Sequence, residues 1–299
     1  MNNRILATLA LIFLGLGSIS FFQLRDLEQT RLIFCDVGQG DGILITSGTK
    51  QVVVDGGPGN KMVDCLGAKM PFWDRQIEMV VLTHPQRDHM EGLIGVLERY
   101  DVGTVVSTGV PNDTEVFRAW ERAVEAERAR VYLPHIGDRF VVNPRRGTTL
   151  SVLWPDRDQA ARWQQDPPTD LNETSIVMRL EWDNPSTRSA RSGQLCAYLT
   201  GDIPKEILVD LIDRGCQILK VSHHGSKTGT SKEVLDKAKP KVAVIQVGKN
   251  SFGHPHKEVL DLLYQRNVKV LRSDTDGKVE ITADGKQLII DKSASRRNN

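Results

Sequence analysis

Apolar positions along the chain change their period several times, and each change marks a new predicted element. Short β-like runs come first, at residues 32–37, 43–46 and 52–54, separated by glycine-rich turns. Residues 79–83 then form a continuous apolar run that is typical of a fully buried strand, and residues 89–100 have apolar positions at helical spacing. The pattern therefore predicts an antiparallel start followed by alternating strands and helices.

The middle of the chain is predicted to hold a helix, a strand-rich stretch and a loop. Apolar side chains recur at helical spacing among many charges between residues 114 and 128. Residues 131–154 are strand-like. Residues 156–171 are polar and carry Pro167-Pro168, so we interpret them as a long loop rather than an element.

The second half repeats the same alternation. The predicted strands are 176–182, 195–200, 218–222 and 242–247, the helices are 203–214 and 257–266, and polar hairpins are expected at 184–194 and 268–290. Because both halves alternate strands and helices, the pattern favours an α/β sandwich with its sheets inside and its helices outside.

The N-terminal segment is apolar from residue 5 to residue 24 and is long enough to span a bilayer. A cleaved secretory signal is the competing interpretation, although Ser18-Ile19-Ser20 is a poor cleavage site, and a buried core helix is a third. We predict a membrane anchor at residues 1–28, a folded domain at 29–292 and a disordered tail at 293–299. Arg4 favours a domain outside the cytoplasm, or a secreted one if the segment is cleaved.

Charge and aromatic content give no global sign of a nucleic-acid partner. The 39 Lys and Arg residues balance the 38 Asp and Glu residues, so the chain has no overall basic field. No stripe of aromatic and basic residues suited to single-stranded nucleic acid stands out in the sequence. A local basic cleft stays compatible with these numbers.

Four cysteines are present, and none forms a CxxC pair. Cys35 and Cys196 lie in apolar, strand-like runs, where a small buried side chain is the ordinary explanation. A disulfide is compatible with an exported domain, but the spacing does not indicate which cysteines would pair.

Six of the seven histidines lie in segments that follow apolar strands. His84 leaves a buried strand, and Asp88 and His89 open the next helix, so this turn directs several side chains toward one point. Asp202 also ends an apolar strand, where an ionised carboxylate needs a cation or hydrogen-bond donors. The alternatives are histidines with a structural role and an Asp202 that caps the helix near Pro204.

Several of these segments together resemble the metallo-β-lactamase superfamily: Asp55-Gly56-Gly57, Thr83–His89, Thr200-Gly201-Asp202 and His223–Ser226. The segments 34–41, 219–226 and 253–256 are similar to the hydrolase domain of ComEC-type DNA-uptake proteins and their stand-alone relatives. The resemblance covers residues 32–290. It implies a four-layer αβ/βα sandwich with a metal cleft at one edge of its two sheets.

The resemblance also implies roles for individual residues. His84 would bind one metal, Asp88, His89 and His223 would bind a second, and Asp202 would bridge the two. Asp88 or Asp202 would accept a proton from water, and His256 would stabilise charge on the leaving oxygen. Asp36 and Asp41 would shape the pocket. Further candidates for metal or phosphate contacts are Gln86, Asn172, His224, Ser226 and Lys227.

Two positions depart from the strongest form of the superfamily pattern. Gln86 stands where a second His or an Asp is usual, and Asn172 stands where many members have a His, although ComEC-like members share this Asn. A neutral amide is a weaker metal ligand than an imidazole or a carboxylate. We therefore expect one firmly bound zinc or manganese ion and a weak or absent second ion.

The resemblance implies a metal-dependent hydrolase that cleaves phosphodiester bonds in DNA with a hydroxide activated by the metal. The segment 225–228 suits a phosphate, or it is simply a capped turn. One alternative is a hydrolase of a small-molecule lactone, ester or phosphate. Another is a catalytically weakened binding module that assists a separate DNA-uptake channel at the membrane.

Overall fold

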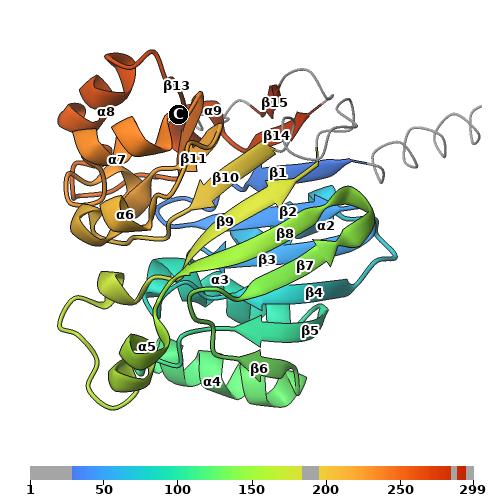
Figure 1. The fold of residues 1–299 in the computed structure, drawn as a ribbon. Coiled ribbons are helices and arrows are strands. Elements are labelled where there is room, and N and C mark those ends of the chain that lie inside the picture. Colours follow the sequence, from blue (N-terminus) through green and yellow to red (C-terminus); the bar gives the residue numbers. More distant parts are fainter. Residues whose placement is uncertain (1–28, 184–194, 284–287, 294–299) are drawn as a thin grey trace, which may run out of the picture.

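Two β-sheets dominate the computed structural model, which describes residues 29–183, 195–283 and 288–293 (Figure 1). The strand order is β15-β14-β1-β2-β3-β4-β5-β6 in the first sheet and β13-β12-β11-β10-β9-β8-β7 in the second. The first sheet contains β1 (Thr30–Phe34), β2 (Gly42–Ser47), β3 (Lys50–Gly56), β4 (Gln76–Val81), β5 (Asp101–Val106), β6 (Arg130–Tyr132), β14 (Val279–Ala283) and β15 (Leu288–Lys292). The second contains β7 (Arg139–Asn143), β8 (Thr148–Trp154), β9 (Val177–Trp182), β10 (Leu195–Leu199), β11 (Ile218–Lys220), β12 (Val242–Ile245) and β13 (Lys269–Arg272).

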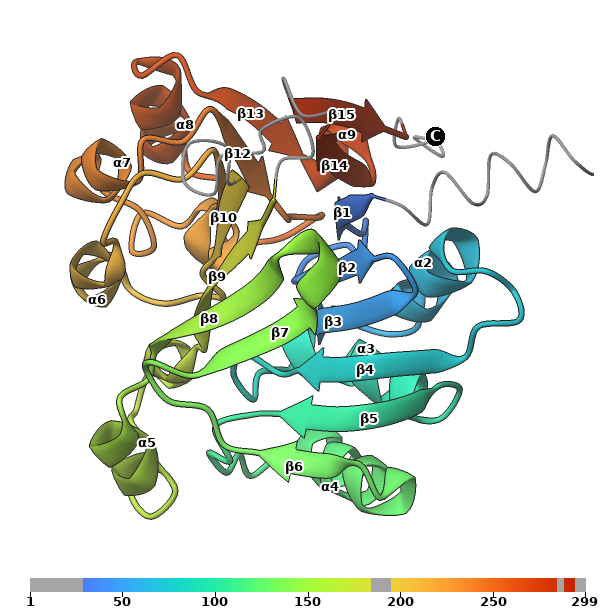
Figure 2. The ribbon, with the colours of Figure 1, turned by 45° about the vertical axis from the view of Figure 1, so that its right-hand side comes forward.

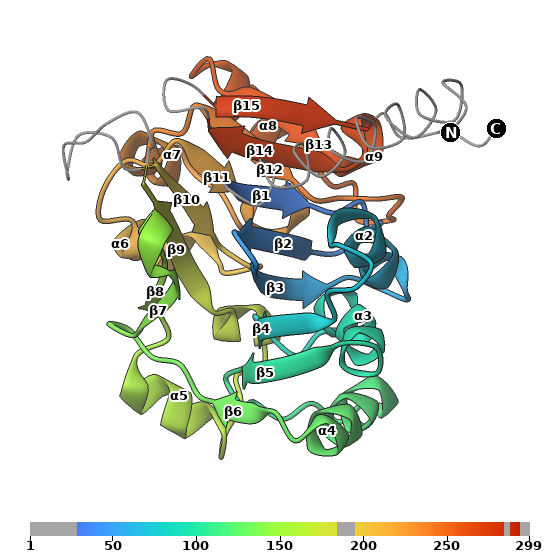
Figure 3. The ribbon, with the colours of Figure 1, turned by 90° about the vertical axis from the view of Figure 1, so that its right-hand side faces the viewer.

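Helices cover the outer face of each sheet, and Figure 3 shows these layers nearly edge-on. The helices are α2 (Lys61–Lys69), α3 (Arg87–Leu97), α4 (Glu115–Glu127), α5 (Arg157–Trp163), α6 (Lys205–Leu211), α7 (Lys232–Ala238), α8 (Lys257–Tyr264) and α9 (Ser273–Asp276), with 3₁₀ turns η1 (Pro144–Arg146), η2 (Leu171–Thr174) and η3 (Ser222–Gly225). One apolar core lies between the sheets, a second lies under α2, α3 and α4, and a third lies under α6, α7 and α8. The predicted α/β sandwich, with sheets inside and helices outside, is confirmed.

The direction of pairing changes within the first sheet, as the apolar pattern predicts. Strands β1, β2 and β3 pair antiparallel, whereas β3, β4, β5 and β6 pair parallel through the crossover helices (Figure 2). The carboxyl ends of β3 and β4 therefore lie at the same edge of the sheet. Loops that follow these strands bring their side chains together there.

Helix α3 is held tightly against the end of β3. The Gly92 N–H donates to the Gly57 carbonyl at 2.8 Å, and a Cβ atom at Gly92 would lie 2.1 Å from the Gly56 carbonyl oxygen. No side chain larger than hydrogen fits at this contact without displacing backbone. The close packing fixes the start of α3, and with it Asp88 and His89, beside the end of β3.

The interpretation of residues 156–171 as a loop without elements is wrong, because α5 occupies Arg157–Trp163. Asp156 caps this helix, since its Oδ1 accepts the Gln159 N–H at 2.8 Å. Ala160 and Trp163, three residues apart, are both buried. A cap and one apolar stripe are enough for a short helix that packs against the body of the protein.

The predicted hairpin at 268–290 is also partly wrong. Strand β13 pairs parallel with β12 in the second sheet, and only β14 and β15 form a hairpin, in the first sheet. The short helix α9 lies between β13 and β14. The hydroxyl of Ser273 in this helix donates to the Val247 carbonyl at 2.8 Å. This contact ties α9 to the end of β12, so the chain crosses from one sheet to the other. Helices α2 and α7 are further elements that the pattern did not predict.

All four cysteines form disulfides. Cys35–Cys65 joins the end of β1 to α2 with a Cα–Cα distance of 6.1 Å, and Cys196–Cys216 joins β10 to the segment before β11 with a distance of 5.1 Å. Cys35 and Cys196 are buried, as expected. The first disulfide links α2 to its sheet, and the second links the segment before β11 to β10.

Three predicted segments lie outside the described residues: the anchor at 1–28, the hairpin at 184–194 and nearly all of the tail. Within the described ranges, none of the helices has both the length and the apolar character needed to cross a bilayer.

Candidate metal centre

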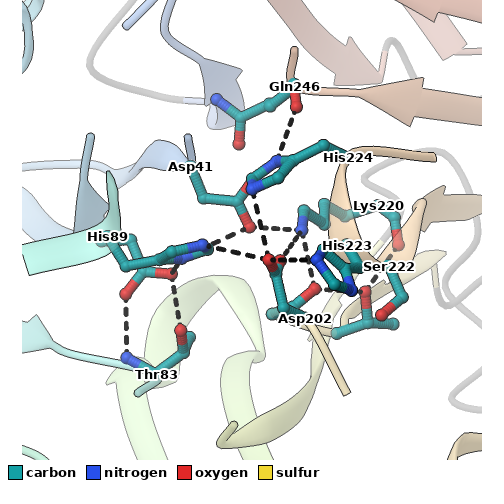
Figure 4. Close-up of polar contacts among 12 residues, drawn as sticks. Asp41, Thr83, His89, Asp202, Lys220, Ser222, His223, His224 and Gln246 are labelled. Atoms are coloured by element: carbon teal, nitrogen blue, oxygen red, sulfur yellow. Dashed lines mark hydrogen bonds and ion pairs between the residues drawn. The ribbon is translucent and has the colours of Figure 1, made fainter. Parts of the chain in front are cut away.

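The side chains of the candidate centre come from loops that follow strands of both sheets, and they meet at one edge of the sandwich (Figure 4). Asp55 ends β3, and His84 follows β4, directly before α3. Asp202 follows β10 in the second sheet, and His224 follows β11. Asp55 and His224, which are 169 positions apart in the chain, are brought together because both sheets end at this edge.

His89 is held by the carboxylate of Asp55. Its Nδ1 lies 2.8 Å from Asp55 Oδ2, and the same carboxylate accepts the Thr83 N–H at 2.8 Å and the Thr83 hydroxyl at 2.7 Å. Because Nδ1 carries the proton in this hydrogen bond, Nε2 is the atom that faces the centre, 3.4 Å from Asp202 Oδ2. A carboxylate behind a histidine is a common support for a metal ligand.

His224 is oriented in the same way by the second sheet. Its Nδ1 donates to the Gln246 carbonyl at 2.8 Å, and its Nε2 lies 3.2 Å from Asp202 Oδ2 and 3.4 Å from Asp88 Oδ2. His84 uses Nδ1 for contacts of 3.1 Å to Thr83 Oγ1 and 3.3 Å to the Ser175 hydroxyl. All three imidazoles thus direct Nε2 toward the same region.

These three Nε2 atoms, of His84, His89 and His224, are buried and have no hydrogen-bond partner among the described residues. Buried polar atoms without partners are costly, and a bound ion is one explanation for them. Ligand atoms of His84, His89 and Asp202 lie within 4.8 Å of one another, as do those of Asp88, His89 and His224. Imidazole and carboxylate donors at this spacing fit a divalent cation.

A fully buried lysine contributes a fixed positive charge to the centre. The Lys220 ammonium donates to the Gly201 carbonyl at 2.7 Å, lies 3.4 Å from Asp202 Oδ1, and forms an ion pair with Asp41. Asp202 therefore offers one oxygen to Lys220 and the other, Oδ2, to the histidines. Lys220 orients this carboxylate.

The centre contains more negative than fixed positive charge. Four carboxylates, of Asp41, Asp55, Asp88 and Asp202, belong to the centre, and the ammonium of Lys220 pairs with two of them, Asp41 and Asp202. Such an excess attracts a divalent cation, and a bound cation would in turn relieve the repulsion between the carboxylates.

The pKa values of the three imidazoles shift in different directions, down for His84 and up for His89 and His224. Burial lowers the pKa of His84 to about 3, so this ring is a neutral ligand. Burial also lowers the pKa of His89 and of His224, but the nearby carboxylates, Asp202 above all, outweigh it and raise both values well above the usual range. A metal that binds these two rings displaces their protons.

The backbone is strained at several residues of the centre. Asp55, His223 and His224 have φ angles of 58°, 52° and 53°, which is the left-handed region that is uncommon for residues other than glycine, although Asp and His adopt it more often than most. Strain of this kind costs about 1–3 kcal/mol per residue and clusters at functional sites. In η3 it determines which of the two adjacent histidines points inward.

The structure brings together most of the predicted ligands. His84, Asp88, His89 and Asp202 share one site. His223, in contrast, is 26% exposed with its Nε2 3.9 Å from Asp202 Oδ2, and its neighbour His224 occupies the inner position. The ligand role of His223 stays a prediction, and His224 has the better geometry.

A cleft of about 590 Å³ opens onto these groups. It is lined by Gln39, Pro58, Gln86, Arg87, Asp88, Asp202, His223, His224, Phe252 and His254. Gln86 thus lines the cleft, and its role as a metal or phosphate contact stays a prediction. Asn172 is buried nearby in η2, with no partner for its Oδ1 among the described residues.

Other predicted residues lie at the side of the cleft. The Ser226 hydroxyl contacts the Thr228 hydroxyl at 2.9 Å, and the Lys227 N–H donates to His256 Nδ1 at 3.3 Å. The roles predicted for these residues are neither supported nor contradicted by this arrangement. His254 lines the cleft in place of His256.

Sequence reasoning gave no role to Lys220 or His254. Lys220 stands in an apolar strand run, 218–222, where a buried charge is itself a signal of a buried partner. Burial, followed by the neighbouring His223, lowers the pKa of His254 to about 4, so its ring is neutral in the cleft. It is able to donate one N–H without carrying charge.

Several solved structures have a similar fold. They include the metallo-β-lactamase fold protein YhfI from Bacillus subtilis (11% identity, 81% of this chain, 95% of that chain, TM-score 0.48). They also include a diphosphatase of the PhnP family (15% identity, 85% of this chain, 98% of that chain, TM-score 0.48). A metallo hydrolase from Ignicoccus hospitalis has 12% identity over 88% of this chain and 100% of that chain, with a TM-score of 0.49.

No protein-family model matches the chain. Two curated proteins do: ComE operon protein 3 of Bacillus subtilis is 28% identical, and recombination protein 2 of Haemophilus influenzae is 24% identical, each over 82% of this chain. The chain spans 32% and 28% of the length of these two relatives. The resemblance that the motifs indicate is thereby confirmed for the section of these relatives that corresponds to this chain.

Proposed function

We propose that the protein is a metal-dependent hydrolase that cleaves phosphodiester bonds, with DNA as its substrate. The convergence of three unpartnered imidazole Nε2 atoms on Asp88 and Asp202 carries this proposal. A histidine with a purely structural role would hydrogen-bond through each buried ring nitrogen, whereas these Nε2 atoms form no hydrogen bond within the described part of the chain and those of His89 and His224 face the Asp202 carboxylate. Asp202 does not cap α6, whose N-cap residue is Pro204, and its carboxylate faces the centre.

A bound divalent cation would supply Lewis acidity and a reactive water near neutral pH. The residues of the chain supply orientation and proton transfer. Asp88, whose side chain is 33% exposed, lines the cleft and is positioned to accept a proton from the attacking water. The neutral ring of His254, on the opposite loop, is positioned to donate a hydrogen bond to a phosphoryl oxygen.

We propose DNA rather than a small molecule for two reasons. The two curated relatives are competence proteins, which supports a role in DNA uptake. Arg87 lines the cleft, and Lys227 and Lys249 are exposed on the loops that follow His224 and precede His254. These cations suit a chain of phosphates better than a neutral lactone.

The test is cleavage of a single-stranded oligonucleotide by the full-length, detergent-purified protein with added zinc or manganese, compared with Asp88→Ala and with the exposed control Asp113→Ala. We expect cleavage by the wild type and by the control, and none by Asp88→Ala, with metal content measured in all three. A wild type that binds metal but cleaves only a small phosphate ester would favour the small-molecule hydrolase. A wild type that binds DNA in a salt-sensitive way but hydrolyses nothing would favour the binding module.

The choice between zinc and manganese is part of the same proposal. Three imidazoles favour zinc, whereas Asp88 and Asp202 also suit manganese. Because the histidines outnumber the carboxylates at the inner positions, we propose zinc as the firmly bound ion. Elemental analysis of protein purified without added metal decides between the two.

We further propose that the domain works outside the cytoplasm. Both disulfides would form in an oxidising compartment, and cytoplasmic proteins rarely keep such bonds. The apolar segment 5–24 would hold the domain at the membrane. Protease digestion of intact cells with a permeable outer layer checks this: an exported domain is digested, whereas a cytoplasmic one is protected.

A further inference from the structure

One exposed aromatic side chain lies at the rim of the metal cleft and has no part in the reaction proposed above. Phe252, in the loop between β12 and α8, is 67% exposed and lines the cleft together with His254. A single exposed phenylalanine needs no functional explanation by itself. Its surroundings therefore decide whether it has a role.

The loop that carries Phe252 is fixed by one side chain. Asn250 Oδ1 accepts the N–H groups of Phe252 and His254, each at 3.0 Å, and its Nδ2 donates to the carbonyls of Gly248 and His254, each at 2.9 Å. Four hydrogen bonds hold the backbone on both sides of the ring. Binding of a ligand to the ring costs little conformational entropy in this loop, because the loop is ordered already.

The ring of Phe252 begins a row of rings that leads into the metal centre. Its centroid lies 5.7 Å from that of His254, with the two planes 32° apart, and the His254 ring lies 5.4 Å from that of His223. His223 is followed by the buried ring of His224, at 6.1 Å. A planar group stacked on Phe252 would therefore lie next to the metal centre, where the proposed function places the scissile phosphate.

The loop that carries Phe252 contains no carboxylate, although Asp88 and Asp202 line the same cleft. Residues 249–257 contain two lysines and two histidines, and Lys257 is paired with Asp261 of α8. The neighbouring loop is joined to this one through the hydrogen bonds from the Lys227 N–H to His256 Nδ1 at 3.3 Å and from the His256 N–H to the Gly225 carbonyl at 3.0 Å. Lys249 precedes Phe252 in the same loop, and Lys227 belongs to the neighbouring loop that these hydrogen bonds join to it. Both lysine side chains are exposed.

We propose that Phe252 is a stacking platform for an unpaired base, so that the cleft binds single-stranded nucleic acid with one nucleotide beside the scissile phosphate. An aromatic ring flanked by cations is the usual way to bind such a strand without reading its sequence. A base inside a duplex has no free face to offer to this ring. The inference rests on the proposed function, because it assumes that the cleft is a nucleic-acid site.

The test measures binding rather than cleavage. The full-length protein is titrated, in EDTA, into a fluorescent oligothymidylate and into a strand of equal length in which every base is replaced by an abasic tetrahydrofuran unit. The anisotropy of both strands is followed for the wild type, Phe252→Ala, Phe252→Tyr and Phe72→Ala. Phe72 is a matched control, since it is 87% exposed and does not line the cleft.

We expect the wild type to bind the strand with bases between about fivefold and a hundredfold more tightly than the abasic strand, the range for one stacked base. Phe252→Ala should lose this preference, whereas Phe252→Tyr and Phe72→Ala should keep it. A wild type without the preference, a wild type that binds neither strand, or a Phe252→Ala variant that retains it would overturn the inference. Because EDTA prevents hydrolysis, a protein that shows the preference but never cleaves DNA would overturn the proposed reaction alone.

Discussion

The hydrogen bond between His89 Nδ1 and Asp55 Oδ2, 2.8 Å long, fixes the nitrogen that His89 presents to the metal centre. Asp55 is itself held by two donors from Thr83, in a left-handed backbone conformation. Its side chain is buried and does not line the cleft. Its position makes it a support for a ligand rather than a ligand.

We therefore expect Asp55→Asn to weaken metal binding while the fold persists. An amide in place of the carboxylate no longer stabilises the same protonation state of His89, and loss of such a partner typically costs about 10–100-fold in metal affinity. Competition with a chelator of known affinity measures the change. The exposed Asp113→Asn is the control, and equal affinity of the two variants would show that Asp55 has no supporting role.

Lys220 and the carboxylates around it lead to a prediction about stability. Lys220→Met leaves Asp41 and Asp202 buried without their cation, so the metal-free variant should lose about 3–5 kcal/mol. A divalent metal ion would restore part of this loss by supplying positive charge. Unfolding in EDTA and in zinc checks both statements.

The matched control for Lys220→Met is the exposed Lys241→Met, which should unfold like the wild type in both conditions. The prediction fails if zinc stabilises Lys220→Met by no more than it stabilises the wild type, because the lysine charge would then be irrelevant to the centre.

The two adjacent histidines of η3 should differ in their effect on metal binding. His224 Nε2 faces Asp88 and Asp202, whereas His223 lies 3.9 Å from Asp202 and is partly exposed. Removing a ligand should cost more than the roughly 10–100-fold loss that follows removal of a supporting group. We expect His224→Ala to lose its metal during gel filtration and His223→Ala to retain it. The reverse order would assign the ligand role to His223.

The disulfides should contribute measurably to stability. They close loops with sequence separations of 30 and 20 residues, and the chain-entropy model gives about 3–4 kcal/mol for each. The pair Cys35→Ala and Cys65→Ala should therefore lower the free energy of unfolding by about 3 kcal/mol. Denaturant titration measures this loss, and thiol titration of the unfolded wild type should detect free thiols only after reduction.

The strand-end positions of the site could be predicted from the sequence because their signal is local. An apolar run followed by His84 or Asp202 already indicates that a polar side chain leaves a sheet edge, and parallel strands bring such edges together. The parallel order of β3 and β4 could not be predicted in the same way, because the sequence pattern did not reveal α2, the helix between them.

Other features of the site depend on contacts between distant segments. The partner of Lys220 could not be predicted, because Asp41 lies about 180 residues earlier in the chain and reaches it only through packing of the two sheets. The left-handed φ angles of His223 and His224 decide which ring points inward, and nothing in the two letters of the sequence indicates that. Disulfide pairing has the same limit, since spacing does not report which helix packs on which strand.

The metal position assigned to His84 has two neutral amides, Gln86 and Asn172, as its other candidate ligands. These weak ligands lead to a prediction about gain of metal binding. His84 offers an unpartnered Nε2, while Gln86 lines the cleft and Asn172 presents an unpartnered Oδ1. Replacing both amides by imidazoles, in Gln86→His with Asn172→His, supplies two stronger donors to the same position. We expect the metal content to rise from about one toward about two ions per chain. Elemental analysis after gel filtration measures it, with Gln39→His, in the same cleft, as the control. An unchanged content in the double variant would mean that geometry, and not ligand strength, limits the centre to one ion.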